Sequence, residues 1–451
     1  MKTRWTRRQV LAGATLAAAT GITAGIGHNF SALANVTLGA ETGRQKGGDA
    51  LVVLFLRGGA DGLNLVAPHG DDDYYRLRPT LALARPKDRR TPAACALDLD
   101  GFFGLHPALA PLHPLYKEGL FTVVHGVGSG DQSRSHFEAM ATMERGLSQQ
   151  SGAASGWLAR HLQLTAGDFE PPLRAVSISE TAPDSLRGAT TVVSLTSLTE
   201  FRLKPPTDNE GKGLHPSDRT AAFTESLKSL YASAPSVVPP TQPHSISLPM
   251  PLEKIGQETL AAIEAVRRLD PAHYQPASNA KYPDTELGNG FRQVSCLLKG
   301  NVGMEVAFLD MQGWDTHIAQ GRETGFHANV LGELGQTLSA FVADMGKEMQ
   351  RVTVVVMTEF GRRAYENYSL GTDHGRASCL FLLGGGVVGG KVHGNWGGLA
   401  QDKLESPGDL KVTTDYRDVL AEVLLRRVKN PHAAEVFPEY TPHPLNIVRH
   451  A

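Results

Sequence analysis

The chain has 451 residues, with 44 Lys and Arg against 46 Asp and Glu and a formal net charge of −2. Nothing in this balance suggests the basic surface that nucleic-acid-binding proteins need, so we expect no nucleic-acid partner. The three cysteines, Cys95, Cys296 and Cys379, are an odd and scattered set, which leaves room for one disulfide but excludes a disulfide framework.

The first 34 residues have the three parts of an export signal in order. Basic residues come first, a weakly apolar stretch follows over 10–27, and Ala32-Leu33-Ala34 supplies an A-x-A cleavage signal. The basic residues are Lys2, Arg4, Arg7 and Arg8. The paired arginines in TRRQVL predict the twin-arginine route. We therefore expect a periplasmic or secreted protein that has the twin-arginine translocase as a partner during export.

Removal of residues 1–34 leaves 40 Lys and Arg against 46 Asp and Glu, a formal net charge of −6. No later segment forms an apolar run long enough to cross a membrane, so we expect no stable membrane span. The remaining chain, residues 35–451, is predicted to be a single α/β domain.

Apolar runs recur along this domain, and each leads into glycine or polar residues. They cover 51–59, 121–130, 174–179, 304–317, 352–361 and 379–386. Helical spacing of apolar residues lies between and after them, most clearly at 258–269, 328–350 and 416–427. Continuous apolar strands are typical of a parallel sheet covered on both faces. The alternation predicts a three-layer αβα sandwich with a mostly parallel central sheet. Residues 204–252, rich in Pro, Ser and Thr, are interpreted as a surface excursion.

Asp61 follows the first run in RGGADGLN. Its neighbouring glycines allow the backbone to turn tightly and to approach a ligand. A carboxylate at this position can bind a metal. Gly-Ala-Asp-Gly is also an ordinary turn, and Asp61 alone does not decide between the two interpretations.

The segment DQSRSHFEAM places two candidate nucleophiles, Ser133 and Ser135, after the run at 121–130. Helical spacing begins here, so a serine at this point is expected to be an N-cap. The same position exposes the hydroxyl and directs backbone N–H groups toward an anion. A bound dication can activate such a serine. The cap and nucleophile interpretations are compatible.

Two further motifs carry candidate metal ligands. In GWDTH, Asp315 and His317 alternate and so face the same side of an extended chain. In GTDHG, Asp373 and His374 are adjacent, so their side chains diverge and can reach two separate ions. His393 follows in KVHG. Two neighbouring ions suit displacement at phosphorus or sulfur. Turns and surface histidines are the alternative for each residue taken singly.

Four arginines, Arg57, Arg134, Arg362 and Arg376, lie beside these motifs. A guanidinium can hold an oxyanion through paired N–H groups. An arginine on a solvated loop is the commoner situation. Oxyanion binding by any one of these arginines is therefore a hypothesis.

Taken together, the motifs LFLRGGADGLNLVAP, DQSRSHFEAM, GWDTH, TEFGR, GTDHG and TDYRDVL resemble those of the exported bacterial "domain of unknown function 1501" family. That family is placed in the alkaline-phosphatase-like superfamily, together with sulfatases and cofactor-independent phosphoglycerate mutases. The resemblance implies an αβα sandwich and a site for up to two divalent metals, without bringing a substrate.

By position, the resemblance implies that Asp61 is a metal ligand and that Ser135 or Ser133 is the nucleophile. It also implies ligand roles for Asp315, His317, Asp373, His374 and His393. In the superfamily the Asp-His pair usually ends its strand directly, whereas here the strand ends at Glu359. Glu359 is therefore a further candidate ligand, and two ions, one or none are all open.

The expected function is periplasmic, metal-dependent hydrolysis of a phosphate or sulfate ester, small or polymeric. Ser135 would attack, with Ser133 as the other candidate nucleophile, and Arg57 or Arg134 would hold the oxyanion. The ion would be Zn, Mg, Mn or Ca. The alternative is a non-catalytic exported binding protein with the same fold.

Overall fold

We analysed a computed structural model of the chain and describe residues 48–88, 90, 95–148, 153–167, 170–189, 191–204, 216–232, 252–277 and 279–451. The predicted signal at 1–34 and much of the 204–252 excursion lie outside these residues. No helix among the described residues is both long and apolar enough to cross a membrane.

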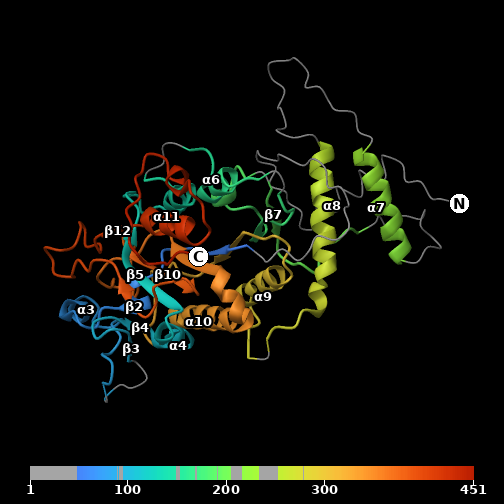
Figure 1. The fold of residues 1–451 in the computed structure, drawn as a ribbon. Helices are drawn as coiled ribbons and strands as arrows, with labels where there is room; N and C mark the ends of the chain where they lie inside the picture. Colours follow the sequence, from blue (N-terminus) through green and yellow to red (C-terminus); the bar gives the residue numbers. More distant parts are fainter. Residues whose placement is uncertain are drawn as a thin grey trace.

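A nine-stranded mixed sheet forms the centre of the molecule (Figure 1). Its order is β11-β5-β10-β9-β1-β8-β6-β7, and β12 pairs with β5. The bounds are β1 Ala50–Leu56, β5 Phe121–Gly128, β6 Ala175–Ile178, β7 Val193–Leu195, β8 Val306–Met311, β9 Val352–Thr358, β10 Ser378–Gly384, β11 Val392–His393 and β12 Thr414–Asp415. Each of the six apolar runs in the sequence overlaps one of these strands, and β1 and β10 begin one residue before their runs.

The strands are apolar throughout because helices cover both faces of the sheet. Along β1, Val52 and Leu54 pack into one core, and Leu51 and Val53 into the other. Helices α9 (Glu286–Lys299) and α10 (Phe326–Met345) close the first face, and α6 (Trp157–Leu164) and α11 (Tyr416–Arg426) close the second. The predicted α/β sandwich of three layers is confirmed.

All strand pairs of this sheet are parallel except those made by β10. β10 runs antiparallel to both β5 and β9. The chain therefore turns back after β9 through residues 359–377 instead of crossing over by way of a helix. This reversal has a direct consequence for the site, because the loop entering β10 lies at the edge where β9 ends.

The remaining elements surround this sandwich. A small sheet, β2-β4-β3, is formed by β2 Val66–Ala67, β4 Gly104–Leu105 and β3 Leu97–Asp98. Short helices are α2 Gly62–Leu65, α3 Asp72–Leu77, α4 His113–Lys117 and α5 His136–Arg145.

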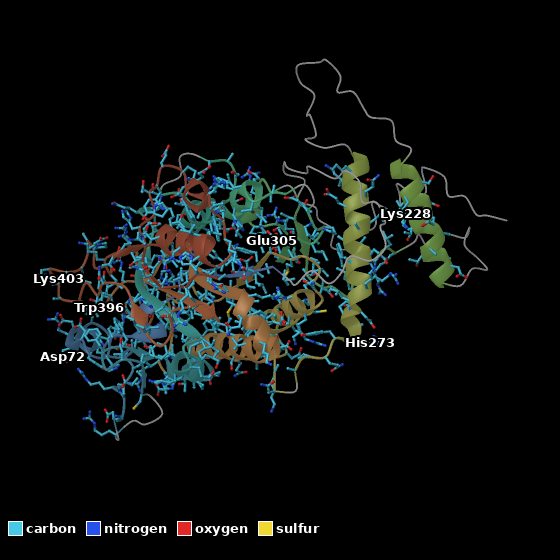
Figure 2. The ribbon with its side chains drawn as sticks, in the orientation of Figure 1. Asp72, Lys228, His273, Glu305, Trp396 and Lys403 are labelled. Atoms are coloured by element: carbon cyan, nitrogen blue, oxygen red, sulfur yellow. The ribbon has the colours of Figure 1, made fainter. Side chains whose placement is uncertain are left out.

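Helices α7 (Pro216–Ala232) and α8 (Leu252–Leu269) pair beside the sandwich. They share a small apolar cluster around Phe223 and Leu227. In Figure 2, Lys228 on α7 lies on the opposite side of the molecule from Asp72 and Lys403.

Cys95, Cys296 and Cys379 all lie among the described residues, and none of them forms a disulfide. Cys296 and Cys379 are buried packing residues, as their apolar surroundings predict.

Candidate metal centre

The candidate site lies at the edge of the sheet where β1, β8 and β9 end together. Leu56, the last residue of β1, pairs with Met311 of β8 and with Thr358 of β9. The loops that follow these strands therefore start at one level. In parallel sheets this edge is where ligands bind.

Gly58 allows two of these loops to meet. A Cβ atom on Gly58 would lie 2.6 Å from the backbone nitrogen of Asp315, and the φ angle of Gly58 is 121°. Any other residue would clash and be strained at this position. The glycine-rich turn after β1 thus allows the loop that carries Asp315 to pack closely against it.

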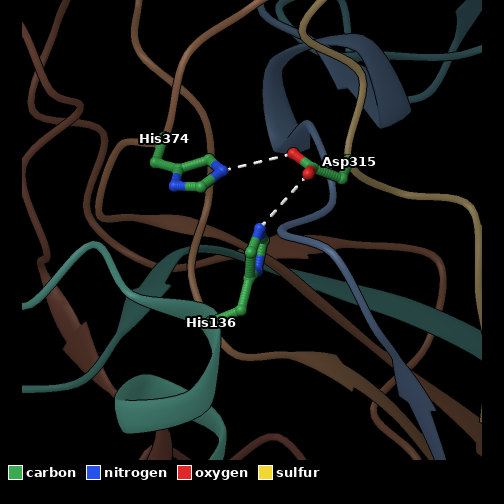
Figure 3. A group of neighbouring side chains, drawn as sticks. All are labelled: His136, Asp315 and His374. Carbon is green, nitrogen blue, oxygen red and sulfur yellow. Dashed lines mark hydrogen bonds and ion pairs between the residues drawn. The ribbon is translucent and has the colours of Figure 1, made fainter.

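Asp315 stands at the centre of a group of three histidines, His136, His317 and His374, which we call with it the Asp315 cluster. Asp315 Oδ1 lies 3.1 Å from His317 Nε2 and 3.2 Å from His374 Nε2. Its Oδ2 lies 3.5 Å from His136 Nε2 (Figure 3). The two Nε2 atoms of His317 and His374 are 2.9 Å apart.

The opposite ring nitrogen of each histidine faces an oxygen acceptor. His136 Nδ1 lies 2.7 Å from Glu359 Oε1, and His317 Nδ1 lies 3.2 Å from Asp373 Oδ1. His374 Nδ1 lies 2.8 Å from the carbonyl oxygen of Arg134. Donation from Nδ1 fixes the tautomer in which Nε2 carries the lone pair. All three lone pairs are then directed toward Asp315, which is the arrangement of metal-binding histidines and their supporting acceptors.

Supporting groups hold these acceptors in turn. Glu359 is buried and accepts hydrogen bonds from the backbone N–H of Gly58 at 2.8 Å and from the Thr358 hydroxyl at 2.9 Å. Asn367 donates to Asp373 Oδ1 at 3.0 Å and to the carbonyl of His317 at 2.9 Å. The site is therefore built before any ligand arrives.

Arg362 sets the electrostatics of Asp315. Its buried guanidinium donates to Asp315 Oδ1 at 2.6 Å and to the carbonyl oxygens of Gly59, Thr372 and Trp314. Burial acts to raise the pKa of Asp315, but this guanidinium outweighs it and brings the pKa to about 2. Asp315 is thus a carboxylate across the physiological range.

Different neighbours shift the pKa values of the histidines and of Asp373. The hydrogen bond to Glu359 raises the pKa of His136 above its usual value. Burial lowers the pKa of His374, although the bond to the Arg134 carbonyl works against it. The amide of Asn367 is the main group that lowers the pKa of Asp373, with His317 adding to the effect.

The donor set fits a divalent transition-metal ion. His136, Asp315 and His374 each offer a ligand atom, and these atoms all lie within 4.8 Å of one another. His136 Nε2 is buried and has no hydrogen-bond partner, so it is poised for a further ligand. Tetrahedral zinc separates its ligand atoms by roughly 3.3 Å, close to the spacings in the cluster. Imidazole nitrogens suit Zn better than the hard ions Mg and Ca, which prefer oxygen.

Asp61 does not join this cluster. It is buried, and its Oδ2 accepts hydrogen bonds from Arg78 at 2.6 Å and from Gln320 at 2.7 Å. Burial acts to raise the pKa of Asp61, but Arg78 holds the pKa below its usual range. We call Asp61, Arg78 and Gln320 the Asp61 network. A guanidinium takes the place that the sequence interpretation gave to a metal ion.

His393 also lies away from the cluster. Its Nε2 lies 3.0 Å from the carbonyl oxygen of Val388. The reversed strand β10 explains this position, because its end delivers the chain to the edge of the sheet opposite the Asp315 cluster. β11 then pairs His393 with Val124, in the first half of β5.

The four arginines predicted to hold an oxyanion all have internal partners. Arg57 pairs with Glu144 at 2.9 Å and Asp310 at 2.6 Å. Arg134 pairs with Asp409, and Arg376 with Glu405. Arg362 is committed to Asp315. These guanidinium groups pair with carboxylates of the loops around the site.

The two serines differ. Ser133 Oγ donates to Glu138 Oε2 at 2.5 Å and accepts the backbone N–H of Ser135 at 3.1 Å. Ser135 is the N-cap residue of α5, but its side chain makes no capping hydrogen bond. Of the pair, Ser135 has the uncommitted hydroxyl, and it immediately precedes His136.

Sequence reasoning missed His136 as a ligand. Its neighbour Ser135 drew attention as a nucleophile, whereas a histidine at the first position of a helix has no motif of its own. The signal available was its place after a strand, among other polar residues that follow strands. Arg78 was missed because the 17 residues that separate it from Asp61 form no recognisable pattern.

Comparison with known proteins finds similarity to a poorly characterised family. A family model described as "Protein of unknown function (DUF1501)" matches residues 257–434, a range that contains Asp315, His317, Asp373 and His374. A search of curated proteins gave no match.

Among solved structures, the alkaline phosphatase from the Antarctic bacterium TAB5 is similar at 10% identity and a TM-score of 0.28, covering 76% of this chain and 93% of that chain. A mutant of TAB5 alkaline phosphatase with Mg bound gives 9% identity and a TM-score of 0.29, covering 75% and 92%. Similarity this low does not support transfer of residues or activity.

Proposed function

We propose that this chain is a metal-dependent hydrolase of phosphate or sulfate esters that acts after export. The observation that carries the proposal is the orientation of His136, His317 and His374. Each has an acceptor at Nδ1 and directs Nε2 toward Asp315. Three such rings around one carboxylate are difficult to explain as packing, because nitrogen lone pairs that face a carboxylate need a proton or a cation between them.

The proposed centre holds one divalent ion, with Zn favoured by the nitrogen ligands. Acidic groups surround the histidines. Asp315 lies beside all three rings, Asp373 beside His317 and Glu359 beside His136, and Arg362 pairs with Asp315. Asp61, the natural ligand for a second ion, is already paired with Arg78.

Ser135 is the proposed nucleophile. The backbone of residues 134–136 is at the centre, because the Arg134 carbonyl accepts from His374 and His136 faces Asp315. A bound dication would supply Lewis-acid stabilisation of the anionic group. Ser135 Oγ would form a bond to phosphorus or sulfur while the bond to the ester oxygen breaks, and the serine proton would pass to the released alcohol. Water would then cleave the seryl ester and release the inorganic anion.

Arg363 is the proposed contact for the anion, in place of Arg57 and Arg134. Its guanidinium donates to the hydroxyl of Tyr365 at 2.5 Å instead of forming a close carboxylate pair. Its charge also reaches Asp373 and helps to lower the pKa of that carboxyl. Arg363→Met should therefore raise KM for the ester more than it lowers kcat.

Metal content tests the centre directly. Purified wild-type protein, dialysed after incubation with zinc, should retain one zinc ion per chain by elemental analysis. His374→Ala should lose it. His393→Ala is the matched control, because His393 is a partly buried histidine outside the cluster, and it should retain zinc. Equal zinc content in wild type and His374→Ala would refute the centre.

Activity tests the nucleophile. Zinc-loaded protein should hydrolyse a generic aryl phosphate or sulfate ester slowly. Ser135→Ala should lower this rate by several orders of magnitude, and Ser133→Ala by less. If Ser135→Ala retained zinc and full activity, the serine would have no part in the reaction. Zinc binding without activity on a broad panel of esters would favour the alternative, a non-catalytic exported binding protein with this fold.

Export by the twin-arginine route is part of the proposal and rests on the N-terminal sequence. Arg7→Lys combined with Arg8→Lys should leave the precursor in the cytoplasm, because the pair is an address read by a receptor. Cell fractionation measures the outcome. Arrival of the double variant in the periplasm of a strain without the translocase would refute the route.

A further inference from the structure

Large hydrophobic side chains that are exposed gather around the Asp315 cluster. Six are exposed among the described residues, four of them in segments that carry residues of the site and one, Phe326, at the start of α10. These five, the apolar rim, are Phe137, Ile318, Phe326, Tyr368 and Leu370. The sixth, Leu425, is near the end of α11. A concentration of exposed apolar residues of this kind marks an interaction surface.

Two rim residues neighbour metal ligands in the chain, and hydrogen bonds join the two loops that carry much of the rim. Phe137 follows His136 and Ile318 follows His317 in the chain. The backbone N–H groups of Ala319 and Gln320 donate to the carbonyl oxygens of Ser369 and Leu370, both at 2.9 Å. The loop with Tyr368 and Leu370 is thereby held against the loop with Ile318.

Phe326 approaches the same group from α10. The backbone N–H of His327 donates to the carbonyl of Gln320 at 3.1 Å. A Cβ atom on Gly313, two residues before Asp315, would lie 3.4 Å from the Phe326 ring. The fifth side chain of the rim therefore belongs to the same neighbourhood as the other four.

The rim side chains protrude instead of lining a pocket. Their exposed fractions are 85% for Phe137, 75% for Ile318 and 109% for Tyr368. Pockets for small molecules bury most of their ligand between converging walls. Side chains this exposed cannot act as such walls, so the occupant must be an extended surface that comes to them.

The two loops of the rim are suited to an apolar medium. Residues 318–321 (IAQG) and 367–372 (NYSLGT) contain no charged side chain. Besides the bonds between the loops, Asn367 Oδ1 accepts from the backbone N–H groups of Ser369 at 2.9 Å and Gly371 at 3.1 Å. Backbone groups that enter lipid must be paired within the protein, and these bonds pair four backbone N–H groups of the two loops.

Backbone strain in these loops also favours display of the rim. Ala319 and Leu370 adopt φ angles of 47° and 57°, in the left-handed region where glycine is usual. Strain of this kind persists when surrounding contacts enforce it, and it concentrates at functional sites. A leucine in this conformation holds its exposed side chain outward at an energetic cost.

The protruding shape of the rim favours a lipid surface over a protein partner. A protein interface needs two surfaces of matching shape that pack as closely as a protein interior. A membrane needs no matching shape, and aromatic and aliphatic tips are the groups that enter its interface.

We propose that the apolar rim is a lipid-binding surface that seats the Asp315 cluster on a membrane. The substrate class that follows is a phosphate or sulfate ester in a lipid headgroup. This substrate assignment rests on the proposed hydrolase function, whereas the lipid contact itself does not.

A tryptophan probe tests the contact in the full chain. Tyr368→Trp should show a blue shift and a gain in emission when uncharged phosphatidylcholine vesicles are added, because the indole enters an apolar region. Leu425→Trp is the matched control and should show neither change. Wild-type spectra are subtracted to remove the native tryptophans. No change at position 368, or an equal change at 425, would overturn the proposal.

Vesicle sedimentation gives a second measurement. Phe137→Ser combined with Tyr368→Ser should weaken vesicle binding by about tenfold or more, since two exposed aromatic side chains no longer contribute apolar area. Leu425→Ser should bind as wild type. Zinc content, measured on the same samples, separates lost lipid contact from a damaged centre.

Equal binding by wild type and the double variant would overturn the proposal and assign binding to another part of the chain. Failure of the hydrolase function would appear differently. Activity would then be absent from wild type while the probe at position 368 still responded to vesicles.

Discussion

The Asp315 cluster and the Asp61 network both follow strands at one edge of the sheet, but different groups surround their central carboxylates. The side chain of Asp315 is 49% exposed and faces three imidazole nitrogens that carry lone pairs. The side chain of Asp61 is 1% exposed and faces a guanidinium that is fully buried. A carboxylate after a strand is therefore not a metal ligand by position alone, since an arginine from elsewhere in the chain can occupy the role of the ion.

This contrast predicts that loss of either carboxylate lowers the free energy of unfolding by a different amount. The larger loss is expected at Asp61. Asp61→Ala leaves Arg78 as an unpaired buried charge and should lower the free energy of unfolding by about 3–5 kcal/mol. Asp315→Ala in chelator should cost less than about 2 kcal/mol, because the side chain of Asp315 is 49% exposed and water screens its pair with Arg362. Urea unfolding measures both. Equal destabilisation would remove the distinction between the two regions.

Acid should destabilise the region of Asp61 more than that of Asp315. Burial lowers the pKa of His106 to about 4 and that of His327 to about 3. The unfolded chain protonates both near pH 6.5 while the folded protein keeps them neutral. Stability should therefore fall below pH 6.5, by about 1.4 kcal/mol per pH unit for each histidine.

His136 has the opposite sign. Its pKa is raised in the metal-free protein by Glu359, so its contribution is present at low pH and lost as pH rises through the folded-state pKa. Urea unfolding in chelator between pH 4 and 7 measures the summed contribution of these histidines to the free energy of unfolding. His327→Gln should reduce the slope between pH 6.5 and 4, and His136→Gln should not. An unchanged slope in His327→Gln would show that this histidine is not protonated on unfolding.

Metal removal should act on the Asp315 cluster alone. An ion that binds only the folded state at a hundred times its Kd adds about 2.7 kcal/mol. Chelator should therefore lower the melting temperature of zinc-loaded wild type and of His393→Ala. His374→Ala should melt near the metal-free value and respond little. A melting curve of wild type that chelator leaves unchanged would contradict the presence of a centre.

The smallest effect is expected from the acceptors behind the histidines. Asp373→Asn removes the negative charge beside His317 Nδ1 and should weaken zinc binding by about 10- to 100-fold. Competition with a fluorescent zinc chelator measures the change. Asp402→Asn, on an exposed aspartate paired with Lys403, is the control and should bind as wild type. Identical affinities for the two variants would mean that Asp373 does not orient the ring.

The architecture was predictable because apolar runs report burial on both faces. VTVVVMT and SCLFLLG gave β9 and β10, but a run that is apolar throughout contains no information on strand direction. The antiparallel direction of β10 could therefore not be predicted from the sequence. The position of His393 away from the Asp315 cluster follows from that direction, so it could not be predicted either. Asp315 and His317 were predictable as a pair because alternation places them on one side, and they meet at 3.1 Å.

Contacts between distant residues set the limit of prediction at the site. His136 joins Asp315 and Glu359 only after the whole sheet has formed, and Arg78 reaches the carbonyl of Ala364, which is 286 residues away in the chain. Local pattern identifies a polar residue after a strand, but it does not identify the partner that neutralises it.

The wide spacing of the ligands also determines when a metal can be captured. The hydrogen bond from His374 to Arg134 spans 240 residues, and contacts of this range form late because a long chain must first be ordered. No fragment that ends before residue 374 contains the complete set of histidines. Capture of an ion by the complete set would therefore require that residue 374 has been made and that these distant segments have folded together. If the chain crosses its membrane already folded, the ion must be loaded on the side where it was made.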